Sequence, residues 1–372
     1  MKISPKPLVL HIRACNFFGG PEKQIINHIK TSKLFNHRVI SFIEGNTENQ
    51  LIQACIKEKI PCSGIYTNHS YEISSIYQMR TVFKNLRPQI ICSHGYRPTM
   101  ISLLAKLGLN ISLIIFSRGH THENFKVKIF EKFELKMLRF AQKIIAVSEG
   151  YSDYLIKKGI NKKKITTVKN AIDIKIQNNK KWDAAAKRYE LGFSHTDFLI
   201  ATAGRLSPEK AQMNLIKAFS MLTEKHKNIH LLLLGDGPLE KEFEQYIADN
   251  RLDHIHLLGF RKDVMEIMNT IDLFVLPSLT EGLPNVVLEA FLCKKPVVAT
   301  KVGGVPEVVD HLKNGIIVPP NDVQRLADGI EYFLTDQKIM LEMGKAGFAK
   351  LQKVFSLEKQ TERLETIYSE LI

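Results

Sequence analysis

Short apolar runs, each followed by a polar or glycine-rich turn and then an amphipathic stretch, recur along this chain. Runs that are apolar across their whole width are typical of strands buried on both faces. Strands of that kind alternating with helices predict parallel sheets covered by helices. In the first half the runs are Leu8–Ile12, Arg38–Ile43, Ile90–Ser93, Leu113–Phe116 and Ile144–Val147.

The apolar rhythm weakens between residues 174 and 197, where a linker with one short helix is expected, and then restarts. A length of 372 residues suggests more than one domain. We therefore expect an α/β protein with two Rossmann-like, doubly wound domains, at residues 1–175 and 176–355, facing a cleft. In the second half the runs are Phe198–Ala203, Ile229–Leu234, Ile255–Leu258, Leu273–Leu276 and Pro296–Ala299.

The formal net charge of +14 is compatible with nucleic acid, with an anionic membrane surface, or with a plain compositional bias. The lysines are scattered, and neither zinc-finger spacing nor an aromatic-rich single-strand motif occurs, so we expect no nucleic acid. The five cysteines form no CxxC pair. With no signal-peptide pattern and no apolar run of about 20 residues, a cytoplasmic protein is expected.

A turn rich in positive charge follows the run that ends at Ala203. The segment GRLSPEK places Arg205 and Lys210 after a strand, and Pro208 and Glu209 are expected to open a helix. Free backbone N–H groups at such a turn, together with two cations, suit a diphosphate. The alternative is a solvated basic loop.

The segment SLTEGLPNVVLEAF holds two carboxylates that flank a helix start. Pro284 suits the first turn of a helix expected to run to Cys293, and the N–H groups around Leu283 to Val286 would form a second anion site. Glu281 and Glu289 could each grip a vicinal diol, one on a sugar and one on a ribose. Alternatively, Glu281 caps the helix and Glu289 is merely exposed.

These motifs resemble a known family. Glu281 to Glu289 resembles the E-x7-E motif of the retaining enzymes of glycosyltransferase family 4, which have the GT-B fold. GRLSPEK looks like their phosphate-binding turn, and residues 146–173 are similar to their interdomain segment, with Ala171 where glycine is usual. Residues 258–278 and 294–309 resemble neighbouring segments, and the likeness extends to FFGGPEK near the N-terminus.

The resemblance implies roles for individual residues. Arg205 and Lys210 would hold the donor diphosphate, Glu281 the donor sugar hydroxyls and Glu289 the ribose. Arg261 would lie near the nucleotide base. The backbone of the segment after Glu281 would complete the phosphate site, and two N-terminal glycines would let their loop approach the phosphates. These backbone positions are Gly282, Leu283, Pro284, Asn285, Val286, Gly19 and Gly20.

Two histidines follow predicted strands of the first half. His120 matches the histidine that such enzymes present between donor and acceptor, where it would join Glu281, Arg205 and Lys210 in catalysis. His120 and His122 could instead be a metal pair, although no third ligand has convincing spacing. His94 is expected to line the acceptor pocket, or else to be an ordinary core or loop histidine.

No Asp-x-Asp motif occurs, so we expect metal-independent catalysis without a cofactor. The resemblance implies a retaining hexosyltransferase that uses a nucleotide-sugar, with UDP favoured as the carrier. The acceptor would be a glycan or lipid-linked glycan in cell-envelope polysaccharide or lipopolysaccharide biosynthesis. Alternatives are a GT-B sugar-nucleotide epimerase, a basic nucleic-acid-binding protein and a non-catalytic partner subunit.

Two further segments have the pattern of helices that pack on the first domain or contact a membrane. Residues 124–143 mix lysines with aromatic and aliphatic residues, which predicts a helix that contacts an anionic membrane or packs on the sheet. Residues 356–372 have the pattern of a helix, and in GT-B enzymes such a tail crosses back to the first domain.

Overall fold

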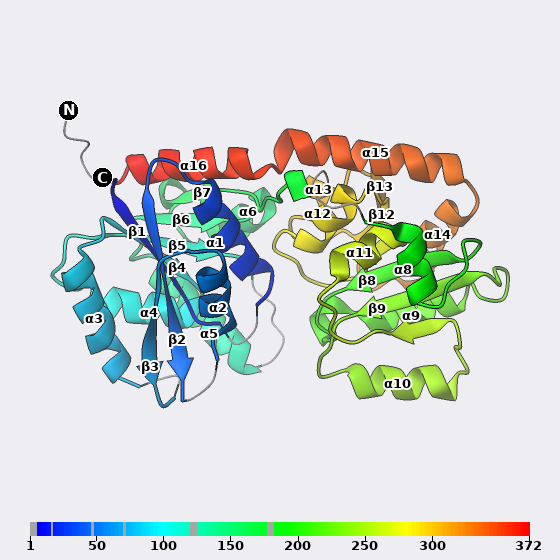
Figure 1. Ribbon diagram of the computed structural model, residues 1–372, viewed down its shortest axis with the longest axis horizontal. Coiled ribbons are helices and arrows are strands. Elements are labelled where there is room, and N and C mark those ends of the chain that lie inside the picture. The colour runs from blue at the N-terminus through cyan, green and yellow to red at the C-terminus, as the bar shows by residue number, and fades with distance from the viewer. Residues whose placement is uncertain (1–5, 16–17, 46–47, 70–71, 120–124, 177–181) are drawn as a thin grey trace. The chain divides into compact units, whose positions relative to one another are not determined.

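The computed structural model divides into two compact units. Of the residues that the structure describes, those before residue 120, those between 125 and 171 and those between 357 and 372 form unit 1, and those between 172 and 356 form unit 2. Each unit contains its own sheet (Figure 1). The structure describes residues 6–15, 18–45, 48–69, 72–119, 125–176 and 182–372.

Unit 1 is built on a parallel sheet whose described part has seven strands in the order β3-β2-β1-β4-β5-β6-β7. The strand order reverses between β1 and β4, which marks the switch point of a doubly wound sheet. The strands are β1 (Leu8–Arg13), β2 (Asn36–Glu44), β3 (Cys62–Thr67), β4 (Ile90–His94), β5 (Ser112–Ser117), β6 (Lys143–Ala146) and β7 (Ile165–Thr167). The helices are α1 (Gly20–Thr31), α2 (Gln50–Lys57), α3 (Ser74–Leu86), α4 (Tyr96–Ala105), α5 (Phe125–Leu138), α6 (Glu149–Lys157) and α16 (Leu357–Ser369).

Successive residues of the central strands in unit 1 belong to different apolar clusters, because side chains alternate across a strand. Leu10 and Ile91 pack in a cluster with residues of α3 and α4. Val9 and Ile90 pack in another, with Leu364, Ile367 and Tyr368 of α16. The C-terminal helix therefore covers one face of this sheet.

Unit 2 has a parallel sheet whose described strands run in the order β10-β9-β8-β11-β12-β13, with the switch point between β8 and β11. The strands are β8 (Phe198–Ala203), β9 (Ile229–Leu234), β10 (Ile255–Leu257), β11 (Leu273–Leu276), β12 (Val297–Thr300) and β13 (Gly315–Val318). The helices are α8 (Ala184–Glu190), α9 (Gln212–Ser220), α10 (Glu240–Asp249), α11 (Val264–Thr270), α12 (Asn285–Leu292), α13 (Val305–Val308), α14 (Val323–Leu334) and α15 (Gln337–Val354). The prediction of two doubly wound parallel-sheet domains is confirmed.

Three strands were not predicted from the apolar runs, and all three lie at sheet edges. They are β3 and β7 in unit 1 and β13 in unit 2. An edge strand can expose part of its surface, and Tyr66 in β3 is 65% exposed. The expectation of one helix over residues 124–143 is also wrong: α5 ends at Leu138, and Lys143 opens β6.

Ala171, which stands where the related segments usually have glycine, fits its position. Its side chain is buried, and it is not among the described residues with positive φ. No left-handed backbone therefore demands glycine there. Gln24 of α1 fixes this residue with two hydrogen bonds, from Nε2 to the carbonyl at 2.7 Å and from the Ala171 N–H to Oε1 at 3.1 Å.

Tyr368 fastens α16 to the sheet and provides a test of this packing. The ring is fully buried, and its hydroxyl lies 3.2 Å from His28 Nε2. Tyr368→Ala should lower the free energy of unfolding by about 3–5 kcal/mol, whereas Tyr368→Phe keeps the ring and should cost only about 1 kcal/mol.

Urea unfolding curves measure these differences. Tyr189→Ala is the control, because its side chain is 87% exposed and its removal should change stability by less than about 0.5 kcal/mol. A Tyr368→Ala variant as stable as the control would contradict the docking of α16 on the sheet.

Candidate active site

Turns at the carboxyl ends of the unit 2 strands touch one another through their backbones. A Cβ atom on Gly235 would lie 2.0 Å from the Gly204 carbonyl oxygen, and one on Gly237 would lie 2.3 Å from that of Leu206. Leu206 N–H also donates to the Asp236 carbonyl at 2.7 Å. Only glycine permits this approach. The two glycines of the segment GDGP are the sequence feature that indicates this close packing, but they were not among the predicted site residues.

The basic turn after β8 differs from the expected helix start. Pro208–Lys210 forms a single 3-10 turn, and α9 begins only at Gln212. Ala211 separates the two with a left-handed backbone, φ +49°. The Glu209 carbonyl accepts a hydrogen bond from Leu279 N–H at 2.8 Å. The prediction that Pro208 and Glu209 open the helix is therefore wrong, and the turn is instead joined to the one after β11.

Lys210 and Glu281, predicted from separate motifs, form an ion pair. Lys210 Nζ lies 2.7 Å from Glu281 Oε1, and Ser278 Oγ donates to the same oxygen at 2.7 Å. The Glu281 side chain is 9% exposed and that of Lys210 is 27% exposed. A nearly buried carboxylate needs such partners, since an unpaired one is costly. Ser278 was not predicted, although it lies in the same motif.

Gly303 holds the backbone of Glu281 in place. Its φ is +47°, and a Cβ atom there would lie 1.7 Å from the Glu281 carbonyl oxygen. The next residue, Gly304, donates its N–H to the Gly282 carbonyl at 2.8 Å. The turn after β12 is thus packed against the turn that carries Glu281.

The helix after Glu281 starts one residue later than predicted. Pro284 has an extended backbone, φ −74° and ψ 111°, and is the N-cap, so α12 runs from Asn285 to Leu292. Glu289 lies in the middle of this helix and is buried, 8% exposed. Its side chain is therefore not simply exposed, and it stands in a helix whose other central residues are apolar and buried. Leu283 and Val286 lie at the start of this helix, as the motif implies.

Arg261 is held within its own turn by carboxylates. Its Nε and Nη2 atoms bind the two Asp263 oxygens at 2.8 and 2.6 Å, and Glu190 Oε1 lies 3.8 Å from Nη2. Hydrogen bonds to Asp263 raise the pKa of Arg261. Lys187 of α8 also binds Asp263, at 2.8 Å. The Arg261 side chain is therefore held by acidic residues of its own turn and of α8.

The predicted residues of unit 1 have separate surroundings. Gly19 is the N-cap of α1, and its N–H donates to Glu22 Oε2 at 2.9 Å, while Gly20 is the first helical residue. The φ of Gly19, −129°, is a backbone conformation that residues other than glycine also adopt. His94, at the end of β4, is 1% exposed, and burial holds its pKa well below the usual value. His120 and His122 lie outside the described residues.

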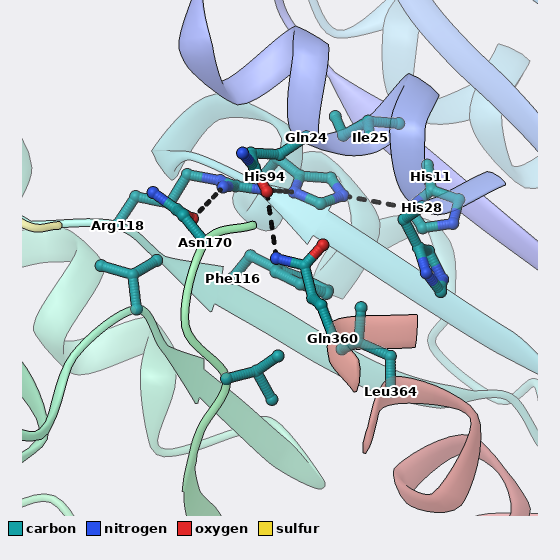
Figure 2. Close-up of a pocket in the computed structure, with 12 residues that line it drawn as sticks. His11, Gln24, Ile25, His28, His94, Phe116, Arg118, Asn170, Gln360 and Leu364 are labelled. Atoms are coloured by element: carbon teal, nitrogen blue, oxygen red, sulfur yellow. Dashed lines mark hydrogen bonds between the residues drawn. The ribbon is translucent and has the colours of Figure 1, made fainter. Parts of the chain in front are cut away.

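His94 lines a small cavity in unit 1, shown in Figure 2 with Arg118, Asn170 and Gln360. The water-accessible space is about 20 Å³. That is room for about one water molecule and none for a sugar. Where side chains are described, His94 therefore contacts the core and this small cavity.

One group of residues in the described chain is close enough to hold a metal ion, namely His11, His28 and His37. All three are buried, and their candidate ligand atoms lie within 4.8 Å of one another. Both ring nitrogens of each histidine have hydrogen-bond partners in the structure.

None of the helices in the described ranges is long and apolar enough to cross a membrane.

The contact at Gly303 gives a direct test of this geometry. Gly303→Ala should destabilise unit 2, because the new methyl group collides with backbone rather than with a movable side chain. Gly192→Ala is a matched control, since Gly192 also has positive φ, +83°, but no atom lies within 4 Å of its Cβ position.

Thermal unfolding of both variants separates backbone strain, which they share, from the collision, which only one has. Gly303→Ala should lose at least about 1 kcal/mol more than Gly192→Ala. Equal losses would contradict the close packing of the two turns.

Comparison with family models agrees with the motifs. Residues 18–176 match the model "Glycosyltransferase Family 4", and residues 183–350 match the model "Glycosyl transferases group 1". The two matches lie mainly in unit 1 and unit 2, respectively.

Individual relatives resemble most of the chain. An uncharacterized glycosyltransferase of Methanocaldococcus jannaschii is 26% identical over 95% of each chain. The capsular polysaccharide biosynthesis glycosyltransferase CapM of Staphylococcus aureus is 26% identical over 80% of this chain and 81% of its own. A UDP-Gal:alpha-D-GlcNAc-diphosphoundecaprenol alpha-1,3-galactosyltransferase of Escherichia coli is 22% identical, covering 81% of this chain and 80% of its own.

Solved structures share the fold. Anabaena HepE in complex with UDP and glucose has a TM-score of 0.86 at 22% identity, covering 98% of this chain and 100% of its own. A glycosyltransferase from Rickettsia africae has a TM-score of 0.83 at 20% identity over 98% of both chains. The chain belongs to glycosyltransferase family 4 and has the GT-B fold.

Proposed function

We propose that this glycosyltransferase transfers a hexose from a UDP-linked donor to a glycan or lipid-linked glycan acceptor during cell-envelope polysaccharide assembly. We propose further that it retains the anomeric configuration and needs no metal ion. The observation that carries the proposal is the ion pair between Lys210 and Glu281 at the carboxyl edge of the unit 2 sheet. This pair supports the proposal because it sets a cation beside a carboxylate, the two kinds of group that would bind the phosphates and the hydroxyls of a sugar diphosphate.

The donor site would use both members of this pair. Lys210, together with Arg205, would hold the diphosphate and stabilise the charge that develops on it as the glycosidic bond breaks. Glu281 binds Lys210 and Ser278 through Oε1, and a carboxylate can accept about four hydrogen bonds in all. Capacity therefore remains for donor hydroxyls, and Glu289 would bind the ribose.

Retention would follow from departure and attack on the same face of the sugar, through an oxocarbenium-like state. In that route the protein mainly stabilises the leaving diphosphate. UDP complexes of HepE support the choice of UDP, as does the UDP-galactose donor in the name of the Escherichia coli relative. The names of that relative and of CapM support a diphosphate-lipid or capsular acceptor.

Peripheral membrane contact is part of the proposal for a lipid-linked acceptor. Phe133 of α5 is 58% exposed, and Phe140, which follows α5, is 69% exposed. Lys132, Lys136 and Arg139 are exposed around them. Exposed rings among basic side chains suit the headgroup region of an anionic bilayer.

Lys210→Ala tests the role of the ion pair. We expect transfer to fall by about 100- to 1000-fold, because charge stabilisation at the leaving group is lost. Lys225→Ala is the matched control: Lys225 also pairs with a glutamate of unit 2, Glu331 at 3.2 Å, but is 68% exposed.

Steady-state kinetics and thermal unfolding of both variants make the comparison. Lys225→Ala should transfer sugar at the wild-type rate. A folded Lys210→Ala variant with wild-type turnover would contradict the diphosphate assignment.

The donor and the metal requirement can be tested together. UDP-, GDP- and ADP-sugars are compared at equal concentration by thermal stabilisation, which increases with the affinity of a ligand for the folded state. We expect the largest shift with UDP-sugars and undiminished transfer in EDTA.

Loss of transfer in EDTA, restored by Mg²⁺ or Mn²⁺, would overturn the metal-free mechanism. Release of UDP and a free epimerised sugar without any acceptor would instead favour an epimerase.

A further inference from the structure

Unit 1 contains a continuous chain of buried and partly buried hydrogen bonds that runs from α16 to the residue after β5. Glu365 Oε1 accepts from Ser32 Oγ at 2.7 Å, and Ser32 Oγ lies 2.7 Å from His37 Nε2. The chain continues from His37 Nδ1 to His11 Nε2 at 3.1 Å and from His11 Nδ1 to His94 Nε2 at 3.2 Å. His94 Nδ1 finally lies 3.5 Å from Arg118 Nη2. Figure 2 shows the end of the chain at His11, His94 and Arg118.

Each histidine in this chain carries a single ring proton. His11, His37 and His94 are 1%, 7% and 1% exposed, and burial lowers the pKa of His37 to about 4. Burial holds the pKa values of His11 and His94 well below the usual range, and neighbouring histidines and Arg118 act in the same direction. All three are neutral at pH 7, so one nitrogen of each ring donates and the other accepts.

The carboxylate end fixes which nitrogen carries the proton. Burial alone would raise the pKa of Glu365, but hydrogen bonds from Leu34, Ser32 and Lys33 lower it, so this group is ionised and only accepts. The Ser32 hydroxyl already donates its only hydrogen to Glu365, so its oxygen must accept a hydrogen bond from His37 Nε2–H. His37 Nδ1 then accepts from His11 Nε2–H, and His11 Nδ1 accepts from His94 Nε2–H.

Arg118, at the other end of the chain, independently requires the same direction of hydrogen bonding. A guanidinium has donors only, so the atom of His94 that faces Arg118 must be an unprotonated nitrogen. The sequence of donors that starts at Glu365 leaves His94 Nδ1 unprotonated, as Arg118 requires. The two ends, on different elements of the fold, therefore agree on one proton arrangement.

We propose that Glu365 is a positioning residue for Arg118: acting through Ser32, it sets the tautomers of His37, His11 and His94 so that His94 accepts a hydrogen bond from Arg118. Arg118 follows β5 directly and also donates to Asn170 Oδ1 at 3.4 Å. If the chain were reversed, His94 Nδ1–H would meet the Arg118 donors and displace them. Arg118 lies two residues before His120, so the effect on transfer rests on the function proposed above.

A buried metal ion is the competing use of these histidines, and the tautomers distinguish the two. An ion between His11 and His37 would take the facing lone pairs of His11 Nε2 and His37 Nδ1, which are 3.1 Å apart. The His11 proton would then sit on Nδ1, whereas the hydrogen-bonded chain places it on Nε2.

Two-bond ¹⁵N–¹H correlation spectra of the ¹⁵N-labelled full-length protein report the tautomer and charge of each ring, with His→Gln variants for assignment. We expect His11, His37 and His94 to be neutral and protonated on Nε2. A cationic ring, or a proton on Nδ1 of any of them, would overturn the proposal. A His11 proton on Nδ1, with signals that shift when Zn²⁺ is added, would identify a metal site instead.

Three variants of α16 test the positioning role. Glu365→Ala frees the Ser32 hydrogen for His37 Nε2, so a population of Nδ1-protonated His94 should appear, and kcat should fall by about ten- to a hundredfold. Glu365→Gln keeps an accepting Oε1 and should restore both the spectrum and kcat. Glu362→Ala is the control, because Glu362 is exposed on the same helix.

The outcomes are separable. An unchanged His94 tautomer in Glu365→Ala would contradict the proposal whatever happens to kcat, since any loss would then come from altered packing alone. A changed tautomer with wild-type kcat would contradict the positioning role. If the wild-type protein transfers no sugar, the proposed function fails, while the spectra still decide whether Glu365 controls the chain.

Discussion

Backbone contact between neighbouring turns is the constraint on which the candidate donor site depends. Gly235 and Gly237 bring the turn after β9 against the turn after β8, and Gly303 brings the turn after β12 against Glu281. The hydrogen bond from Leu279 to the Glu209 carbonyl joins the two sides. Because these contacts are made by backbone atoms, they fix the positions from which the side chains extend. The turns that carry Lys210 and Glu281 are thereby held close enough for the two side chains to pair.

Those contacts also explain how a buried carboxylate is tolerated. Glu281 is almost fully covered, yet its oxygen has an ammonium group and a hydroxyl within 2.7 Å. In the absence of a donor, the pair satisfies both charges. A sugar diphosphate would bring its own negative charge to Lys210 and its hydroxyl groups to Glu281. Under the proposed function, the site would therefore suit a ligand that offers both a phosphate charge and hydroxyl groups.

The sequence predicted the fold class because buried parallel strands must be apolar across their whole width, and these are visible as runs. It missed β3 and β7 because edge strands need not satisfy that rule, and it missed β13 although Gly315–Val318 is a short apolar run. The motifs identified Lys210 and Glu281 separately, but their ion pair depends on backbone contacts far apart in the chain. Arg261 has acidic partners on α8 and within its own turn, and no local sequence pattern predicts these ion pairs. The histidine chain was also missed, because its members come from β1, β2, β4 and α16.

The two units illustrate different uses of buried polar groups. In unit 2 a partly exposed lysine pairs with a nearly buried carboxylate, and in the proposed function a ligand would join this pair. In unit 1 the buried histidines are neutral, and an ionised carboxylate and a guanidinium are held at opposite ends of their chain. The first arrangement suits binding of a charged donor, and the second suits a fixed geometry near Arg118.

A crystal structure of the protein with an intact UDP-sugar tests the central claim most directly. The account predicts phosphate oxygens within about 3.2 Å of Lys210 Nζ and sugar hydroxyls at a similar distance from the Glu281 carboxylate. A donor bound with its phosphates remote from Lys210, while the pair with Glu281 stayed intact and out of contact with the ligand, would contradict it.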